Sequence, residues 1–180
     1  MKLKIKNPNI TQISVIANPG DFFYGKCNWA EVAFDSDSWR MTAASDSGDF
    51  SYTWSVEHGN RTFLKLMSEI DKQYLLDKIS SLSQFDLEET KESFIANNEL
   101  DEEQKQFITG LRGISSAEIF INELEESELF EHWSEAYEYI QYDYPARAKA
   151  FVDVFIGVIQ PALKHLFILQ GDEELLSDLI

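Results

Sequence analysis

The amino-acid sequence predicts an α+β fold, in which an N-terminal antiparallel β-meander is followed by a C-terminal multi-helix portion. Apolar and polar residues alternate through residues 2–56, which is the period of strands that bury one face. Turn-forming residues separate the alternating segments. From about residue 61 onward, the apolar residues recur with the period of a helix.

The predicted strands follow one another through the first part of the chain. They cover residues 2–6, 10–17, 30–35, 39–43 and 50–56. Two segments, 18–21 and 46–49, are rich in Asn, Asp, Gly and Pro or Ser, and these residues favour tight turns. Because alternation buries one face of a sheet, we expect the opposite face to present Ser, Thr and Arg40 to solvent.

The predicted helices occupy the rest of the chain. They cover residues 61–70, 71–82, 86–97, 101–110 or 101–113, 115–124, 127–142, 146–169 and 172–180. Asp71, Asp101 and Ser127 are expected to cap three of them, since their side chains can accept hydrogen bonds from the first free N–H groups. Pro161 should kink the long helix, because proline lacks an N–H and its ring displaces a carbonyl.

The length and composition suit one domain, or one domain with a helical extension. The chain has 180 residues, of which 44% are hydrophobic and 13% aromatic, enough to bury a core. We divide it into residues 1–85, with the sheet and the first helices, and residues 86–180. The second portion is acidic and helical, and we expect it to pack on the sheet as part of one domain.

Charge is distributed unevenly along the chain. Residues 1–85 hold ten acidic and nine basic side chains, whereas residues 86–180 hold 22 acidic and six basic ones. The net charge of −17 therefore comes almost wholly from the second half. Direct binding to nucleic acid or to an anionic membrane is not expected, because phosphate contacts need Lys and Arg. A basic protein partner is favoured instead.

Signatures of catalysis and of cofactors are missing from the sequence. None of the three histidines adjoins a nucleophile motif, and the acidic pattern around His132 occurs once, whereas a di-iron bundle needs it twice. We therefore expect no enzyme, no metal and no cofactor. The single Cys27 excludes an intramolecular disulfide and fits the cytoplasm. No segment approaches the roughly 20 apolar residues that span a bilayer.

The candidate partner-binding site is an acidic helical face in residues 118–143. In a helix over residues 117–142, the spacing places Glu128, Glu131, Glu135 and Glu138 on one face, with the aromatic residues of the segment on the other. Such a row of carboxylates is a coarse imitation of DNA phosphates. The candidate residues are Glu118, Glu125, Glu128, Glu131, Glu135, Glu138, Tyr139, Tyr142 and Asp143.

Part of the chain resembles small acidic accessory proteins encoded by phages and prophages. The resemblance lies in residues 39–79, which contain WRMTAASDSGDFSYTW and GNRTFLKLMSEIDKQYLLDKI, and more weakly in PARAKAFVDVFIGVIQPAL, residues 145–163. It implies a mobile-element origin and no particular activity. Its matched residues fit sheet-to-helix packing and capping: Phe63, Leu64, Asp71, Tyr74 and Lys78. The acidic residues 86–143 lie outside it.

These observations lead to one principal functional hypothesis. We expect a non-enzymatic protein, located in the cytoplasm of a host cell, that binds and inhibits a basic nucleic-acid-binding defence protein, such as a CRISPR or restriction component, by imitating DNA. The near-neutral sheet would then serve as a scaffold or as the surface of a homodimer. The alternatives are an immunity protein for a basic nuclease toxin, a small enzyme whose site is not visible in the sequence, and a virion accessory protein.

Overall fold

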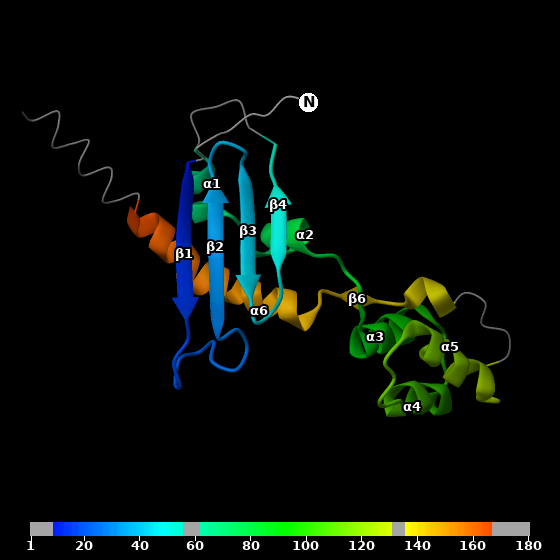
Figure 1. Ribbon diagram of the computed structural model, residues 1–180. Coiled ribbons are helices and arrows are strands. Elements are labelled where there is room, and N and C mark those ends of the chain that lie inside the picture. The colour runs from blue at the N-terminus through cyan, green and yellow to red at the C-terminus, as the bar shows by residue number, and fades with distance from the viewer. Residues whose placement is uncertain (1–8, 56–61, 131–135, 167–180) are drawn as a thin grey trace, which may run out of the picture. The chain divides into compact units, whose positions relative to one another are not determined.

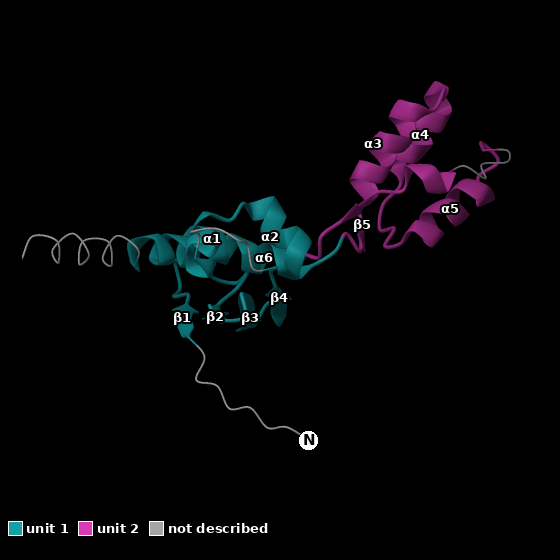
Figure 2. Cartoon of the chain, turned by 90° about the horizontal axis from the view of Figure 1, so that it is seen from above, with its two compact units in different colours: residues 1–81, 146–180 teal, residues 82–145 magenta. Residues whose placement is uncertain are grey.

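The computed structural model describes residues 9–55, 62–130 and 136–166, and it confirms the α+β prediction (Figure 1). The chain forms two compact units (Figure 2). Unit 1 combines residues 1–81 with residues 146–180, and unit 2 consists of residues 82–145. The last long helix therefore belongs with the sheet. The packing of the acidic helices on that sheet stays a prediction.

The four long strands form one antiparallel sheet in the order in which they occur along the chain. They are β1 (Ile10–Ile16), β2 (Trp29–Asp35), β3 (Arg40–Ser45) and β4 (Phe50–Thr53). Val32 in β2 lies opposite Ile13 in β1 and opposite Ala43 in β3. This sheet is the predicted meander. The predicted strand over residues 2–6 lies outside the described residues.

Helices of unit 1 cover one face of this sheet, and no described helix of that unit lies on the other, which we call the open face (Figure 2). The covering elements are α1 (Phe63–Glu69), α2 (Lys72–Ile79), α6 (Ala146–Val154) and the π-helical turn η2 (Phe155–Ile159). Phe34 on the covered face is fully buried, and its ring meets the rings of Phe63 and Phe155 at centroid distances of 6.3 and 6.1 Å. The opposite face carries Arg40 and exposed Ser and Thr side chains, as predicted, and it also carries the exposed apolar residues Ile10, Ile16 and Trp29.

Local sequence signals explain where these helices begin and where the long one is distorted. The Asp71 carboxylate accepts hydrogen bonds from the backbone N–H groups of Gln73 and Tyr74, so the predicted cap of α2 is confirmed. The π turn η2 ends two residues before Pro161, which cannot supply a backbone N–H. A side chain at Gly157, within η2, would meet the Phe23 ring, because an added Cβ would lie 2.7 Å from Phe23 Cζ.

Unit 2 has a hydrophobic core of its own. It contains the helices α3 (Leu87–Asn97), α4 (Glu102–Gly110) and α5 (Ala117–Glu126), the short 3₁₀ helix η1 (Ala136–Tyr139), and a two-stranded ladder of β5 (Gln84–Phe85) with β6 (Tyr142–Asp143). Phe94, Ile108 and Phe120 are fully buried in this core. Asp101 caps α4 as predicted, in a reciprocal capping box with Gln104.

The predicted helix over residues 127–142 is wrong. Helix α5 ends at Glu126, and Ser127 closes it as a C-cap instead of opening a new helix, with its hydroxyl donating to the Leu124 carbonyl at 2.8 Å. Tyr142 and Asp143 are extended because they pair with β5. This pairing involves residues that are distant in sequence, so helical periodicity alone could not reveal it. Residues 131–135, and the predicted helix over 172–180, lie outside the described residues.

Candidate functional site

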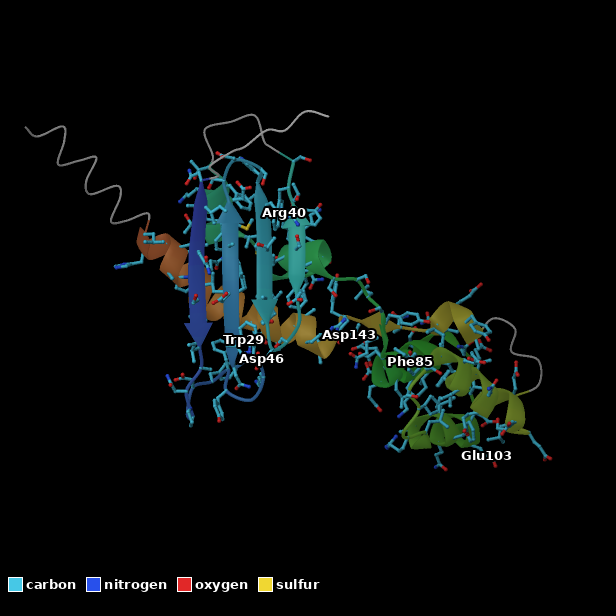
Figure 3. All side chains as sticks on the ribbon, viewed as in Figure 1. Trp29, Arg40, Asp46, Phe85, Glu103 and Asp143 are labelled. Carbon is cyan, nitrogen blue, oxygen red and sulfur yellow. The ribbon has the colours of Figure 1, made fainter. Side chains whose placement is uncertain are left out.

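Unit 2 carries most of the excess negative charge of the protein. Residues 82–145 contain seventeen acidic and three basic side chains, and the rest of the chain contains fifteen and twelve. The net charge is thus −14 for unit 2 and −3 for unit 1. The candidate site is therefore built on a folded unit with an apolar core and an acidic surface, on which carboxylates such as that of Glu103 are exposed (Figure 3).

The three basic residues of unit 2 are already engaged by neighbouring groups. Lys91 is buried, with its Nζ 2.9 Å from Glu88 Oε1, and this hydrogen bond holds the pKa of Glu88 below its ordinary value. Lys105 Nζ lies 3.3 Å from Glu102 Oε1. Arg112 donates from Nη1 to the backbone carbonyl of Leu111 at 2.7 Å, at the end of α4. Most of the acidic side chains on this surface are therefore not balanced by a base of the same unit.

Several of these carboxylates stabilise the helices that carry them. Glu88 and Glu89 lie in the first turn of α3, Glu102 and Glu103 in the first turn of α4, and Glu118 in the first turn of α5. A negative charge near a helix N-terminus interacts favourably with the helix dipole. These five acids thus have a structural explanation that requires no partner.

A second group of carboxylates lies where charge opposes the helix dipole. Glu123, Glu125 and Glu126 occupy the last turn of α5, which contains no basic residue, and Glu128 follows the C-cap. All four side chains are exposed. An acid in the last turn of a helix costs about 0.3–1 kcal/mol at low ionic strength. We call these four residues the α5 terminal cluster. Three of them, Glu123, Glu125 and Glu126, carry charge that lowers the stability of the helix to which they belong.

The structure separates the predicted site residues instead of aligning them on one helix. Glu118 and Glu125 are both exposed on α5, seven residues apart and hence on one side of it. Glu128 lies in the turn after α5, and Glu138 is exposed in η1. Glu131 and Glu135 lie outside the described residues. The predicted single stripe from Glu128 to Glu138 is therefore wrong. It requires one helix that continues through residue 138, but the helix of the structure ends at Glu126.

The aromatic residues of the segment are also arranged differently from the prediction. Tyr139 is half-buried against Phe94, with ring centroids 5.7 Å apart. Tyr142, in β6, is 48% exposed, and Asp143 beside it is half-buried. Tyr137, one of the aromatic residues expected on the helix face opposite the glutamates, is 61% exposed. Sequence reasoning missed Glu123 and Glu126 as well, although their position beside Ser127 was a signal for the end of a helix.

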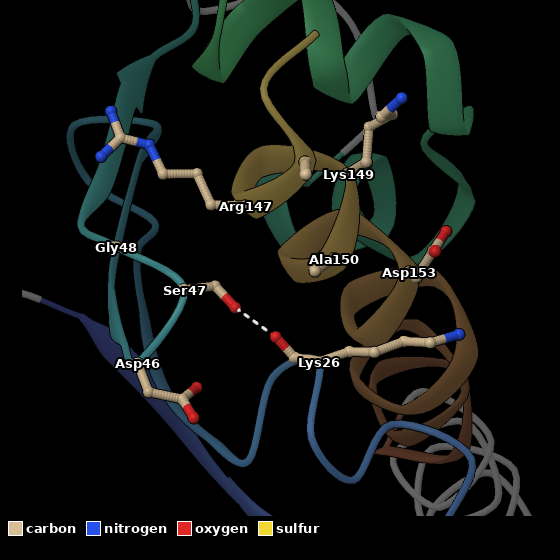
Figure 4. A pocket seen from close by; sticks show the side chains of 9 residues that line it. Lys26, Asp46, Ser47, Gly48, Arg147, Lys149, Ala150 and Asp153 are labelled. Atoms are coloured by element: carbon tan, nitrogen blue, oxygen red, sulfur yellow. Dashed lines mark hydrogen bonds between the residues drawn. The ribbon is translucent and has the colours of Figure 1, made fainter. Parts of the chain in front are cut away.

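Unit 1 contains a hollow of about 660 Å³ between the 46–48 turn and the start of α6 (Figure 4). Its charged lining residues are Lys26, Asp46, Arg147, Lys149 and Asp153. Both acids have partners: Asp46 accepts hydrogen bonds from Asn28 and Trp29, and Asp153 lies 2.7 Å from Lys72 Nζ. The Ser47 hydroxyl donates to the Lys26 carbonyl at 3.0 Å, which does not prepare it as a nucleophile.

The pKa values near this hollow follow from local contacts. Burial acts to raise the pKa of Asp46, but hydrogen bonds from the backbone of Asn28 and Trp29 and from the Asn28 side chain lower it below its ordinary value. Burial raises the pKa of the Cys27 thiol; a hydrogen bond with Ser47 opposes this, and the Asp46 charge reinforces it. A thiol with a raised pKa is a poor nucleophile at neutral pH.

Two features are absent from the residues that the structure describes: a cluster of metal ligands and a membrane-spanning helix. Within residues 9–55, 62–130 and 136–166, no three His, Cys, Asp or Glu side chains are grouped so that they could hold a metal ion. Among those residues there is also no helix with the length and hydrophobicity needed to cross a bilayer.

Comparison with known protein families gives a match over most of the chain. The model of the family Phage_phiTE_072, described as a phage family, matches residues 2–165. The match includes unit 2 and the α5 terminal cluster, which lie outside the resemblance noted in the sequence. No curated protein and no solved structure matches the chain.

Proposed function

We propose, since the chain belongs to the phage family that matches residues 2–165, that it is a non-enzymatic inhibitor of a basic nucleic-acid-binding host protein. Unit 2 is the part that binds, and the target surface is one that normally contacts nucleic acid. Unit 1 is the scaffold. The mechanism is occlusion of that basic surface by carboxylates.

The observation that carries this proposal is the α5 terminal cluster. Four exposed carboxylates lie at a helix end where each last-turn acid lowers the stability of the helix. The C-terminus of a helix already carries a partial negative charge of about half a unit. The α5 terminal cluster and the end of the helix together form a site of concentrated negative charge. A charge arrangement that lowers the stability of the fold is better explained by binding than by solubility. A surface that mixes positive and negative charges would also be soluble.

The physical consequence is association that depends on electrostatic attraction. A concentrated negative field steers a basic partner toward the cluster and raises the association rate. At physiological ionic strength the Debye length is about 8 Å, so added salt should screen this attraction strongly. Nucleic acid should compete for the same basic surface, because phosphates and carboxylates attract the same Lys and Arg side chains.

The test compares capture from a host lysate by the wild-type protein and by two variants of equal charge. The first variant changes Glu123, Glu125, Glu126 and Glu128 to Gln. The matched control changes four other exposed acids of unit 2 to Gln: Glu89, Glu92, Glu99 and Glu103. We expect a captured nucleic-acid-binding protein that high salt or added DNA releases. It should be lost with the first variant and retained with the control.

Two outcomes would contradict the proposal. A folded cluster variant that still captures the same partner would remove the role of the cluster. A partner that resists both salt and nucleic acid would show that apolar contacts, and not the acidic surface, hold it. Circular dichroism of both variants establishes that they are folded.

A further inference from the structure

Strand β1 ends the sheet of unit 1 and leaves one side of its backbone without a partner among the described residues (Figure 1). At the two ends of β1, Ala17 N–H donates to Asn28 O and Ser36 N–H donates to Asn9 O. Asn9 and Ala17, both odd-numbered, are therefore hydrogen-bonded to the β2 side. Because antiparallel ladders alternate, the odd-numbered residues of β1 face β2. The N–H and C=O groups of Ile10, Gln12, Ser14 and Ile16 therefore point outward from the edge.

This edge lacks the features that normally prevent strand pairing. Natural edge strands are short, or carry charges, prolines or bulges. The seven residues of β1, ITQISVI, contain no charge and no proline, and their register against β2 runs without interruption. Ile10 and Ile16 are 50% and 77% exposed. The opposite edge, β4, has only four residues.

We propose that β1 pairs antiparallel with β1 of a second copy of this chain, so that the two sheets join into one of eight strands. The register is centred on Ile13. It places Ile10 opposite Ile16 of the second copy, Gln12 opposite Ser14, and Ile13 opposite itself. The four even-numbered positions then form the hydrogen-bonded pairs, with about eight inter-chain hydrogen bonds in all.

The side chains of β1 are complementary in this register. On the open face, Ile10 of one copy meets Ile16 of the other, beside Trp29, which pairs with Ile16 within the sheet. Gln12 and Ser14 face each other and can form hydrogen bonds. On the covered face, Thr11 lies opposite Val15, and all the inward residues of β1 are only half-buried in one copy. On the open face like residue types thus meet, and on the covered face the β-branched pair Thr11 and Val15 flanks the pair of Ile13 residues; β-branched and apolar pairs of this kind favour cross-strand pairing.

Electrostatics also favours a second copy at this edge. Unit 1 has a net charge of −3, compared with −14 for unit 2, so two copies of unit 1 repel each other less than two copies of unit 2 do. The inference does not depend on the proposed function, because it concerns unit 1 alone.

The first experiment measures the molecular mass in solution by sedimentation velocity over a range of concentrations. We expect a dimer for the wild-type protein. The variant with Gln12→Lys and Ser14→Lys places like charges opposite one another across the joined strands, so its dimerisation should weaken about tenfold or more. The matched control, Thr42→Lys with Ala44→Lys, adds the same charge to exposed positions of the same face in β3 and should remain dimeric. A monomeric wild-type protein at all concentrations, or a β1 variant that dimerises as the control does, would overturn the proposal.

The second experiment tests the register. Cα atoms of a hydrogen-bonded antiparallel pair lie about 5.5 Å apart, within the range that a disulfide bridges. Chains carrying Ile10→Cys and chains carrying Ile16→Cys should therefore form a disulfide-linked dimer when mixed under mild oxidation, and neither should do so alone. Both positions are exposed, so neither change should disturb folding. Equal cross-linking of the unmixed chains would contradict the register, and no cross-link in a dimeric mixture would place the interface elsewhere.

Discussion

The Gln160 side chain donates a hydrogen bond from Nε2 to the backbone oxygen of Ile70 at 2.8 Å, in a buried position. Ile70 is the extended C-cap of α1, directly before Asp71, the N-cap of α2. Gln160 follows the π turn η2. The bond therefore joins the two segments of unit 1, which the whole of unit 2 separates along the chain.

Replacing Gln160 with Leu should destabilise unit 1 by about 1–3 kcal/mol, because the Ile70 carbonyl would remain buried without its donor. Urea unfolding followed by circular dichroism measures this difference. The control is Gln106→Leu at an exposed position of α4, where a surface change should stay within about 0.5 kcal/mol. Equal stability of the two variants would show that water or another donor replaces Gln160.

The stability of unit 2 should change in opposite directions when a negative charge is removed from the start of a helix and when one is removed from its end. Changing Glu125 and Glu126 to Gln should raise stability by about 0.6–2 kcal/mol, because these charges oppose the dipole at the end of α5. Changing Glu89 and Glu103 to Gln should lower it by a similar amount, because these charges stabilise the first turns of α3 and α4. Thermal melts at low salt measure both effects, and 1 M salt should reduce them. A loss of stability in both pairs would show that the α5 acids support the fold.

Asp46 should contribute to the acid sensitivity of unit 1. Its pKa in the folded protein lies below the ordinary value of 3.8, so its contribution to stability is fully present above that value. The contribution is lost as the pH falls through the lower, folded-state pKa. An Asp46→Asn variant should thus show a smaller loss of stability between neutral pH and pH 3, measured by unfolding at a series of pH values. An unchanged pH slope would mean that other carboxylates dominate acid unfolding.

Cys27 should react slowly with thiol reagents in the native protein. Its side chain is 1% exposed, and burial, opposed by Ser47 and reinforced by Asp46, raises its pKa. Labelling by iodoacetamide at pH 7.5 should therefore require opening of the structure and should accelerate in urea along with unfolding. Fast labelling without denaturant would show that the segment around residue 27 opens locally. Slow labelling would also keep Cys27 from interfering with the cross-linking experiment on β1.

The strands and the capped helices were predictable because their signals are local. Alternation along β2 and β3 marks the buried face, and Asp71 and Asp101 mark helix starts by a hydrogen bond that spans only two or three residues. The helix predicted to begin at Ser127 is wrong because a serine can cap either end of a helix, and Ser127 caps the end of α5. The pairing of Tyr142 with Phe85, which are far apart along the chain, makes residues 142–143 extended.

The sequence by itself determined the fold class, the order of the strands and the excess of acidic residues after residue 85, because composition and periodicity are properties of neighbouring residues. The tertiary structure alone decided that residues 146–166 return to the sheet while residues 82–145 form their own core. It also decided which acids stabilise a helix and which oppose its dipole, since that depends on where each helix ends. Burial and strand pairing bring together residues that are far apart along the chain, and local patterns do not record such contacts.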